Sequence, residues 1–192
     1  MALSEPDRQR LAALSHRHEL AETIACFQQL VRSDPTDVRS LDSLGIALAR
    51  ADQPNAAQRR FEQALSVDPQ NVKAHFHLGL LWAKSGQLRR AVAQFQRTLQ
   101  LDDQCSEAHT NLATAYFKQQ ALDKAEQHVR QAIQLRTADV RAHYKLATVL
   151  LHRQDHLGAK EHLLRALGIQ PDNMQARKRL ARLREVMQRR GR

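Results

Sequence analysis

Several ingredients are scarce in this 192-residue chain, and each scarcity argues against a class of protein. Only 6 residues are glycine, so the tight loops of catalytic and phosphate-binding sites have little material. No Gly-rich phosphate loop, GxSxG or HExxH motif is present. No run of roughly 18 apolar residues occurs, so membrane insertion is not expected. The sequence therefore predicts a protein that is not an enzyme and that needs no cofactor.

Cysteine is also scarce, with only Cys26 and Cys105 in the chain. The two lie far apart in the sequence, which favours separate thiols over a disulfide and fits a reducing compartment. The first residues, MALSEPDRQRLAAL, lack the basic and then apolar pattern of a signal peptide. The expected location is therefore cytoplasmic.

Aromatic residues make up only 4% of the chain, although hydrophobic residues make up 42%. This balance is typical of helices that pack through alanine and leucine. The stretch 72–105 carries apolar residues at helical spacing in two segments, and Ser85-Gly86-Gln87 interrupts the pattern between them. The stretch thus predicts a helical hairpin, which needs a neighbour of the same kind to bury both of its apolar faces.

The same pattern recurs along the chain with a fixed period of about 34 residues. One column of the repeat holds leucine: Leu44, Leu78, Leu112, Leu146 and Leu180. Two columns hold small residues: Gly45, Gly79, Ala113 and Ala147, then Ala57, Ala91, Ala125 and Ala159. Another column holds bulky residues: Phe27, Phe61, Phe95, Val129 and Leu163. Small residues suit close helix approaches and bulky residues fill the gaps between hairpins, so this period predicts a solenoid.

A unit of this length with Leu-Gly in its first helix, Ala and Phe in its second, and proline near its end resembles the tetratricopeptide repeat (TPR). The resemblance implies an all-α fold, a right-handed α-solenoid of about five helix–turn–helix repeats in a single domain. The expected repeats are 4–37, 38–71, 72–105, 106–139 and 140–173, followed by a capping helix at 174–190. In the first repeat, helices are expected at Pro6–Ser15 and Leu20–Arg32, with a turn at His16-Arg17-His18.

TPR proteins bind partner peptides along a concave surface formed by the first helix of each repeat. The resemblance therefore implies a non-catalytic scaffold or adaptor that binds a protein or peptide. The positions expected to line this groove are Lys73, Phe76, His77, Leu80, Thr110, Asn111, Thr114, Arg141, Tyr144 and Lys145. Apolar groups beside basic and amide groups suit a peptide with acidic residues. The alternative is that neighbouring helices cover these positions.

Three of these residues also match part of a carboxylate clamp known from TPR cochaperones. Asn111, Arg141 and Lys145 fit, whereas Phe76 and Leu80 stand where a lysine and an asparagine would be. A full clamp is therefore not predicted. Two cations and an amide donor can nevertheless hold one acidic group.

The histidines do not predict a metal site. His75, His109 and His143 recur once per repeat, so they lie about one hairpin width apart, too far to share an ion. His152 and His156 stand on either side of a predicted turn. Packing is the better interpretation for all five.

The charge of the chain is concentrated at its end. Residues 172–192 contain eight basic and two acidic residues, which is +6 of the net +10. The basic residues of this predicted patch are Arg177, Lys178, Arg179, Arg182, Arg184, Arg189 and Arg190. Such a run is typical of a solvated cap, but it also suits nucleic-acid phosphates or an acidic partner. A nucleic-acid-associated protein is therefore one alternative function. The resemblance to TPR arrays implies another, an adaptor arm of a larger enzyme or secretion assembly.

Overall fold

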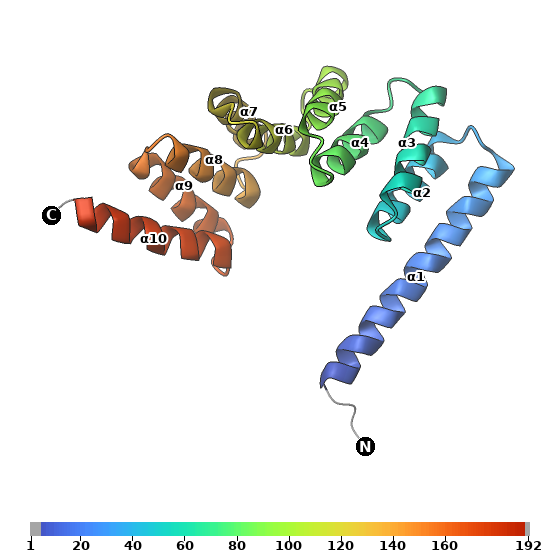
Figure 1. Cartoon of the computed structure of the whole chain (residues 1–192), viewed down its shortest axis with the longest axis horizontal. Helices are drawn as coiled ribbons and strands as arrows, with labels where there is room; N and C mark the ends of the chain where they lie inside the picture. The colour runs from blue at the N-terminus through green and yellow to red at the C-terminus, as the bar shows by residue number, and fades with distance from the viewer. Residues whose placement is uncertain (1–4, 191–192) are drawn as a thin grey trace. The chain divides into compact units, whose positions relative to one another are not determined.

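The structure, a computed structural model, describes the backbone of residues 5–190 and the side chains of residues 19–189. These residues form ten α-helices and no strand, as labelled in Figure 1. The helices are α1 (Glu5–Ser33), α2 (Val38–Arg50), α3 (Pro54–Val67), α4 (Val72–Lys84), α5 (Leu88–Leu101), α6 (Ser106–Lys118), α7 (Leu122–Leu135), α8 (Val140–His152), α9 (His156–Ile169) and α10 (Met174–Arg190). The all-α prediction is confirmed.

From the second repeat onward, the helices follow the predicted repeats. Each repeat contains a first helix of 13 residues and a second helix of 14 residues, beginning with α2 and α3 and ending with α8 and α9. The capping helix α10 begins and ends where the sequence predicts it. The turn at Ser85-Gly86-Gln87 separates α4 from α5 as expected.

The repeat columns form the core. The four bulky residues from Phe61 to Leu163 are fully buried, and so are the alanines from Ala57 to Ala159. Glycine in the neighbouring column has a steric reason, because a Cβ on Gly45 would lie only 2.5 Å from the ring of Phe61. Each column is thus a contact that is repeated once per hairpin.

Each first helix begins at a related capping position. Asp37, Asn71, Asp139 and Asn173 occupy the same position of their repeats, and each side chain accepts hydrogen bonds from backbone N–H groups of the first helical turn. Cys105 occupies this position before α6, where burial raises the pKa of its thiol. The capping column explains where the first helices start and why Cys105 is only partly exposed.

The turn inside each hairpin also repeats. Asp52, Gly86, Gln120 and Gln154 all have positive φ, between 56° and 77°, and each lies one repeat after the one before. This left-handed conformation favours glycine, yet only one of the four is glycine. The corresponding residue of the first repeat is His18, which lies inside α1.

The predicted turn in the first repeat is therefore wrong. The backbone of His16, Arg17 and His18 is helical, and α1 runs without interruption from Glu5 to Ser33. The predicted turn contains no glycine or proline to interrupt the helix, and the leucine and alanine columns of this repeat are occupied by Arg10 and Thr23. The side chains expected to face inward there, Leu11 and Leu14, lie outside the described residues.

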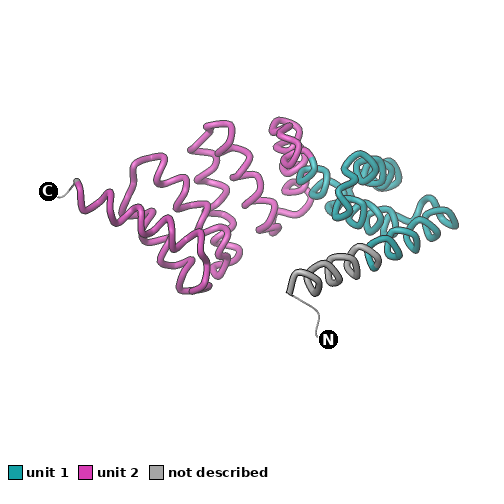
Figure 2. The backbone as a smooth tube through the Cα atoms, turned by 60° about the horizontal axis from the view of Figure 1, so that its bottom comes forward, with its two compact units in different colours: residues 1–81 teal, residues 82–192 magenta. Residues whose placement is uncertain are grey.

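Backbone contacts divide the chain into two compact units, shown in Figure 2: unit 1 extends to Leu81, and unit 2 begins at Trp82. Unit 1 contains α1, α2 and α3, with α2 packed against both of its neighbours, and most of α4. In unit 2, the helices from α5 to α10 each pack against the next, and α6 also contacts α8. That both units form one domain stays a prediction.

Candidate functional site

The first helices of unit 2 are linked directly to one another. Arg141 on α8 donates a hydrogen bond to the side-chain oxygen of Asn111 on α6, at 3.3 Å. Arg179 on α10 donates to the hydroxyl of Thr148 on α8, at 2.6 Å. These contacts join residues about one repeat apart and bring α6, α8 and α10 together on one surface. We call this surface, formed by those three helices in unit 2, the first-helix face.

A hollow of about 220 Å³ opens on the first-helix face. It is lined by residues of all three helices: Ala113, Thr114, Phe117, Tyr144, Lys145, Thr148, Val149 and Arg179. We call it the α8 hollow. Its walls combine apolar groups with two cations, so it can accept an apolar side chain and an anion side by side.

Arg179 is held firmly at one wall of the α8 hollow. Its guanidinium lies 5.0 Å from the centre of the Tyr144 ring, a cation–π distance. Thr148, which accepts its hydrogen bond, in turn donates to the backbone carbonyl of Tyr144 at 2.9 Å. The cation is therefore preorganised by α8. The sequence assigned Arg179 to the basic patch, but in the structure Arg179 lines the α8 hollow.

Lys145 is the second cation that lines the α8 hollow. It is half-buried, and its pKa is lowered from the usual range, first by burial and then by Arg141, Lys118 and Arg179. All three neighbours that shift its pKa are themselves positive. The protein thus holds an ammonium group among like charges, an arrangement that an anion would relieve.

The remaining groove residues predicted in unit 2 differ in their accessibility. Thr110 is buried, with 1% of its surface exposed, and its hydroxyl donates to the carbonyl of Ser106. It is therefore not available to a ligand. Thr114 lines the α8 hollow and donates to the carbonyl of Thr110 at 2.9 Å. Asn111 keeps its amide N–H groups, because its contact with Arg141 uses only the oxygen.

Unit 1 contains the other four predicted groove residues. His77 stacks on the buried ring of Phe61, with ring centres 5.4 Å apart, and Phe76 meets His77 edge-on. Burial lowers the pKa of His77, and Lys73 adds to this effect. His77 is therefore a packing residue. Phe76 and Leu80 are partly buried and Lys73 is exposed.

Sequence reasoning missed two histidine pairs. Each pair connects the two helices of one hairpin, the first pair between α6 and α7 and the second between α8 and α9. Nδ1 of His109 lies 3.1 Å from Nδ1 of His128, and Nδ1 of His143 lies 3.0 Å from Nδ1 of His162. Burial lowers the pKa of His109, His128 and His162. The signal was present, since both pairs have the same separation in the sequence and the second follows the first by one repeat. Among the described residues, no group of three or more potential ligands could hold a metal ion.

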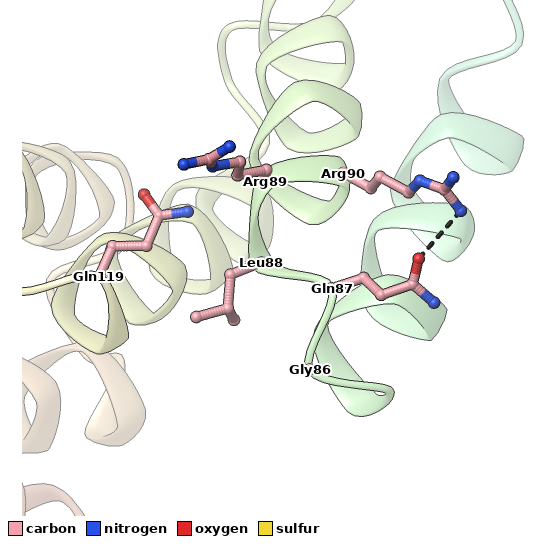
Figure 3. A pocket seen from close by; sticks show the side chains of 6 residues that line it. All are labelled: Gly86, Gln87, Leu88, Arg89, Arg90 and Gln119. Carbon is pink, nitrogen blue, oxygen red and sulfur yellow. Dashed lines mark hydrogen bonds between the residues drawn. The ribbon is translucent and has the colours of Figure 1, made fainter.

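A wider hollow of unit 2 arises from the repeat itself. It measures about 740 Å³ and lies where α5 begins, beside Gln119 (Figure 3). Arg90 donates to Gln87 at 2.9 Å and lies over the Trp82 ring. A similar hollow of about 480 Å³ recurs one repeat later, around Gln120 and Arg153. Because the same hollow forms at equivalent turns of two successive repeats, we do not treat it as a candidate site.

On α10, the predicted basic patch is largely exposed. Its exposed members are Arg177, Lys178, Arg182, Arg184 and Arg189. The side chain of Arg190 lies outside the described residues. Within those residues, no helix is both long and apolar enough to cross a membrane.

Sequence comparison identifies the repeat family. Models of the tetratricopeptide repeat match residues 48–113, 83–149 and 140–173, so the matched segments run without a gap from 48 to 173. No curated protein sequence matches the chain.

Structural comparison finds the same architecture in solved proteins. The structure of MamA residues 41 to the end from Desulfovibrio magneticus RS-1 has a TM-score of 0.74 and 20% identity, over 90% of this chain and 99% of that one. YrrB, described as a TPR protein with an unusual peptide-binding site, has a TM-score of 0.69 and 23% identity, over 86% and 85%. A thermophilic TPR protein from Thermus thermophilus has a TM-score of 0.69 and 18% identity, over 94% and 98%. At these identities the likeness concerns the fold alone.

Proposed function

This chain belongs to the tetratricopeptide repeat family, and on that premise we propose that its first-helix face binds an extended segment of a partner protein that carries a carboxylate. TPR domains bind protein or peptide partners and are generally non-catalytic. YrrB is described as having a peptide-binding site. In this chain, the site of binding is the α8 hollow and the cations around it.

The observation that carries the proposal is the environment of Lys145. Its ammonium group is half-buried, and its pKa is lowered by burial first and then by its positive neighbours Arg141, Lys118 and Arg179. A carboxylate placed between Lys145 and Arg179 replaces the repulsion between these cations with charge-assisted hydrogen bonds. The asparagine amide of Asn111 adds a neutral donor on the α6 side of the same surface.

The shape of the α8 hollow defines the second feature of the ligand. About 220 Å³ is enough for one apolar side chain but not for a folded element, and Phe117, Tyr144 and Val149 offer an apolar lining. The segment therefore presents an apolar residue next to an acidic residue or next to its own C-terminal carboxylate. Binding of this kind makes the protein an adaptor or scaffold, and neither catalysis nor a cofactor is part of it.

A peptide selection tests the proposal. Random nonapeptides displayed on phage are selected on the immobilised full chain, and the affinities of the enriched peptides are measured by calorimetry. We expect enrichment of an acidic group beside an apolar residue. Lys145→Glu should weaken these peptides by about tenfold or more, since hydrogen bonds to charged groups contribute about 1.5–3 kcal/mol.

Two further variants separate the charge from the hollow. Lys160→Glu makes the same charge change on α9, away from the α8 hollow, and should leave affinity nearly unchanged. Thr114→Leu fills the hollow without altering any charge and should weaken peptides that carry a large apolar residue. The proposal is wrong if selected peptides bind Lys145→Glu as tightly as the wild type, or if Lys160→Glu weakens them equally.

A further inference from the structure

The outer surface of α10 carries five exposed cations: Arg177, Lys178, Arg182, Arg184 and Arg189. Glu185 is the one acidic residue of the helix. None of the five cations forms an ion pair with a described carboxylate. By contrast, Arg130, Arg153 and Arg165 of unit 2 are each paired with a carboxylate. The five charges are therefore available to a partner.

These cations are ordered by the helix. Ala176, Leu180 and Leu183 are buried and fix which side of α10 packs on the core. Helical geometry then places Lys178, Arg182 and Arg189 along one edge of the exposed side and Arg177 and Arg184 along the other. At about 1.5 Å per residue, Lys178 and Arg182 are about 6 Å apart along the axis, and Arg189 lies about 10 Å further on. The cations form two rows that a linear polyanion can follow.

A second hollow lies beside the first of these rows. It measures about 320 Å³ and is lined by Tyr144, Gln175, Lys178, Arg179 and Arg182. Three cations and an amide around one hollow suit a group with several acceptor oxygens, such as a phosphate. Four of the five exposed cations are arginine, whose planar fork fits phosphate oxygens in pairs.

We propose that the exposed side of α10 binds the phosphodiester backbone of nucleic acid, without reading its bases. A nucleic acid offers closely spaced negative charges along its whole length, and each cation that neutralises a phosphate releases a counterion. The helix has no aromatic residue for base stacking, so contact is limited to the backbone. This inference does not depend on peptide binding at the α8 hollow, because the five exposed cations do not line that hollow, although Arg179 and Tyr144 line both hollows.

A salt titration of binding tests the inference. The probe is a fluorescein-labelled oligothymidylate of about 20 nucleotides, and anisotropy is measured with the full chain from about 50 to about 200 mM KCl. For about three to five phosphate contacts, the slope of log affinity against log salt should be about −2 to −3.5. The double variant Lys178→Ala with Arg182→Ala should make this slope shallower by about 1.4 and weaken binding at the lowest salt.

A charge-matched control distinguishes a site from a general effect of net charge. Arg130→Ala with Arg165→Ala removes two cations from α7 and α9, both of which are already ion-paired with carboxylates. This variant should bind the probe nearly as the wild type does. The inference is overturned if no binding occurs at the lowest salt or if the control variant loses as much affinity as the α10 variant. It is also overturned if polyglutamate of equal charge competes as well as unlabelled oligothymidylate, because the surface would then be specific for acidic protein.

Discussion

Unit 2 treats its positive charges in two different ways. On α7 and α9, arginines are paired with carboxylates: Arg130 with Glu126 and Arg165 with Glu161, both at 2.7 Å. Arg153, in the turn after α8, contacts both Asp123 and Glu126 of α7, at 2.6 and 3.1 Å. On the first-helix face, Arg141 and Arg179 contact neutral side chains instead, and no described carboxylate pairs with Lys145.

The difference shows on which side of unit 2 the positive charges are already neutralised by carboxylates of the chain. The paired arginines of α7 and α9 would interact only weakly with an added anion. The cations around Lys145 repel one another, and a bound anion would reduce this repulsion. The chain does not lack carboxylates, since it has 20 acidic residues. None of the described carboxylates pairs with Lys145, Arg141 or Arg179, and this is the reason that we propose the first-helix face as the binding side.

The largest expected effects on stability come from reversing one charge on each side of unit 2. Lys145→Glu places a carboxylate among three cations and should stabilise unit 2 by about 1 kcal/mol. Arg153→Glu places a third carboxylate beside Asp123 and Glu126 and should destabilise it by about 1–2 kcal/mol. Thermal unfolding followed by circular dichroism measures both changes.

The opposite signs are the essential result of this test. Lys145→Glu should raise the melting temperature and at the same time weaken peptide binding by about tenfold or more, as expected for a residue kept for function at a cost in stability. If both substitutions destabilise the chain to the same extent, the two sides do not differ electrostatically and the argument for a binding side fails.

A smaller effect on stability is expected from protonation of the histidine pairs, each of which joins a first helix to a second helix. Nε2 of His143 donates to the carbonyl of Thr137, so its Nδ1 is the acceptor and Nδ1 of His162 is the donor. Because burial lowers the pKa of His109, His128 and His162, the unfolded chain binds protons more readily than the folded one. Stability should therefore fall as the pH drops through about 6.5.

Replacing the second-helix histidine of each pair should flatten this pH dependence. The double variant His128→Gln with His162→Gln follows the chain's own precedent, since Gln94 stands one repeat before His128. It should cost under about 1 kcal/mol at pH 8, because glutamine can still donate a hydrogen bond. A double variant that loses stability on acidification as steeply as the wild type would contradict this role.

The repeat period allowed most of the fold to be predicted from the sequence. Leu112, Ala125 and Val129 were assigned to core columns, and all three are fully buried. Steric columns are readable because one contact recurs in every hairpin. The continuous α1 was not readable in this way, because the first repeat departs from the columns, with Arg10 in the leucine column and Thr23 in the alanine column.

The candidate site was predictable only in part. Tyr144 and Lys145 were expected on the first-helix face, and both line the α8 hollow. Thr110 was expected beside them but is buried, because a first helix buries more than its leucine and alanine columns. Arg179 belongs to a charge run in the sequence, and only its position over Tyr144 reveals its separate role. Periodicity gives the face of a helix, but the direction of a long side chain depends on its neighbours.

The smallest expected effect, and the most direct comparison of the two sides, is the response to salt. In the wild type, screening relieves repulsion on the first-helix face and weakens the ion pairs of the second helices, so the two effects offset each other. Lys145→Met removes most of the first effect, and its melting temperature should fall as KCl rises from about 50 to about 500 mM. Arg153→Met removes two ion pairs, and its melting temperature should rise over the same range. The differences amount to a few tenths of a kcal/mol, as is typical of exposed charges, so both variants are compared with wild type in one differential scanning series. Parallel salt dependence in the two variants would mean that the unpaired cations of the first-helix face do not repel one another appreciably.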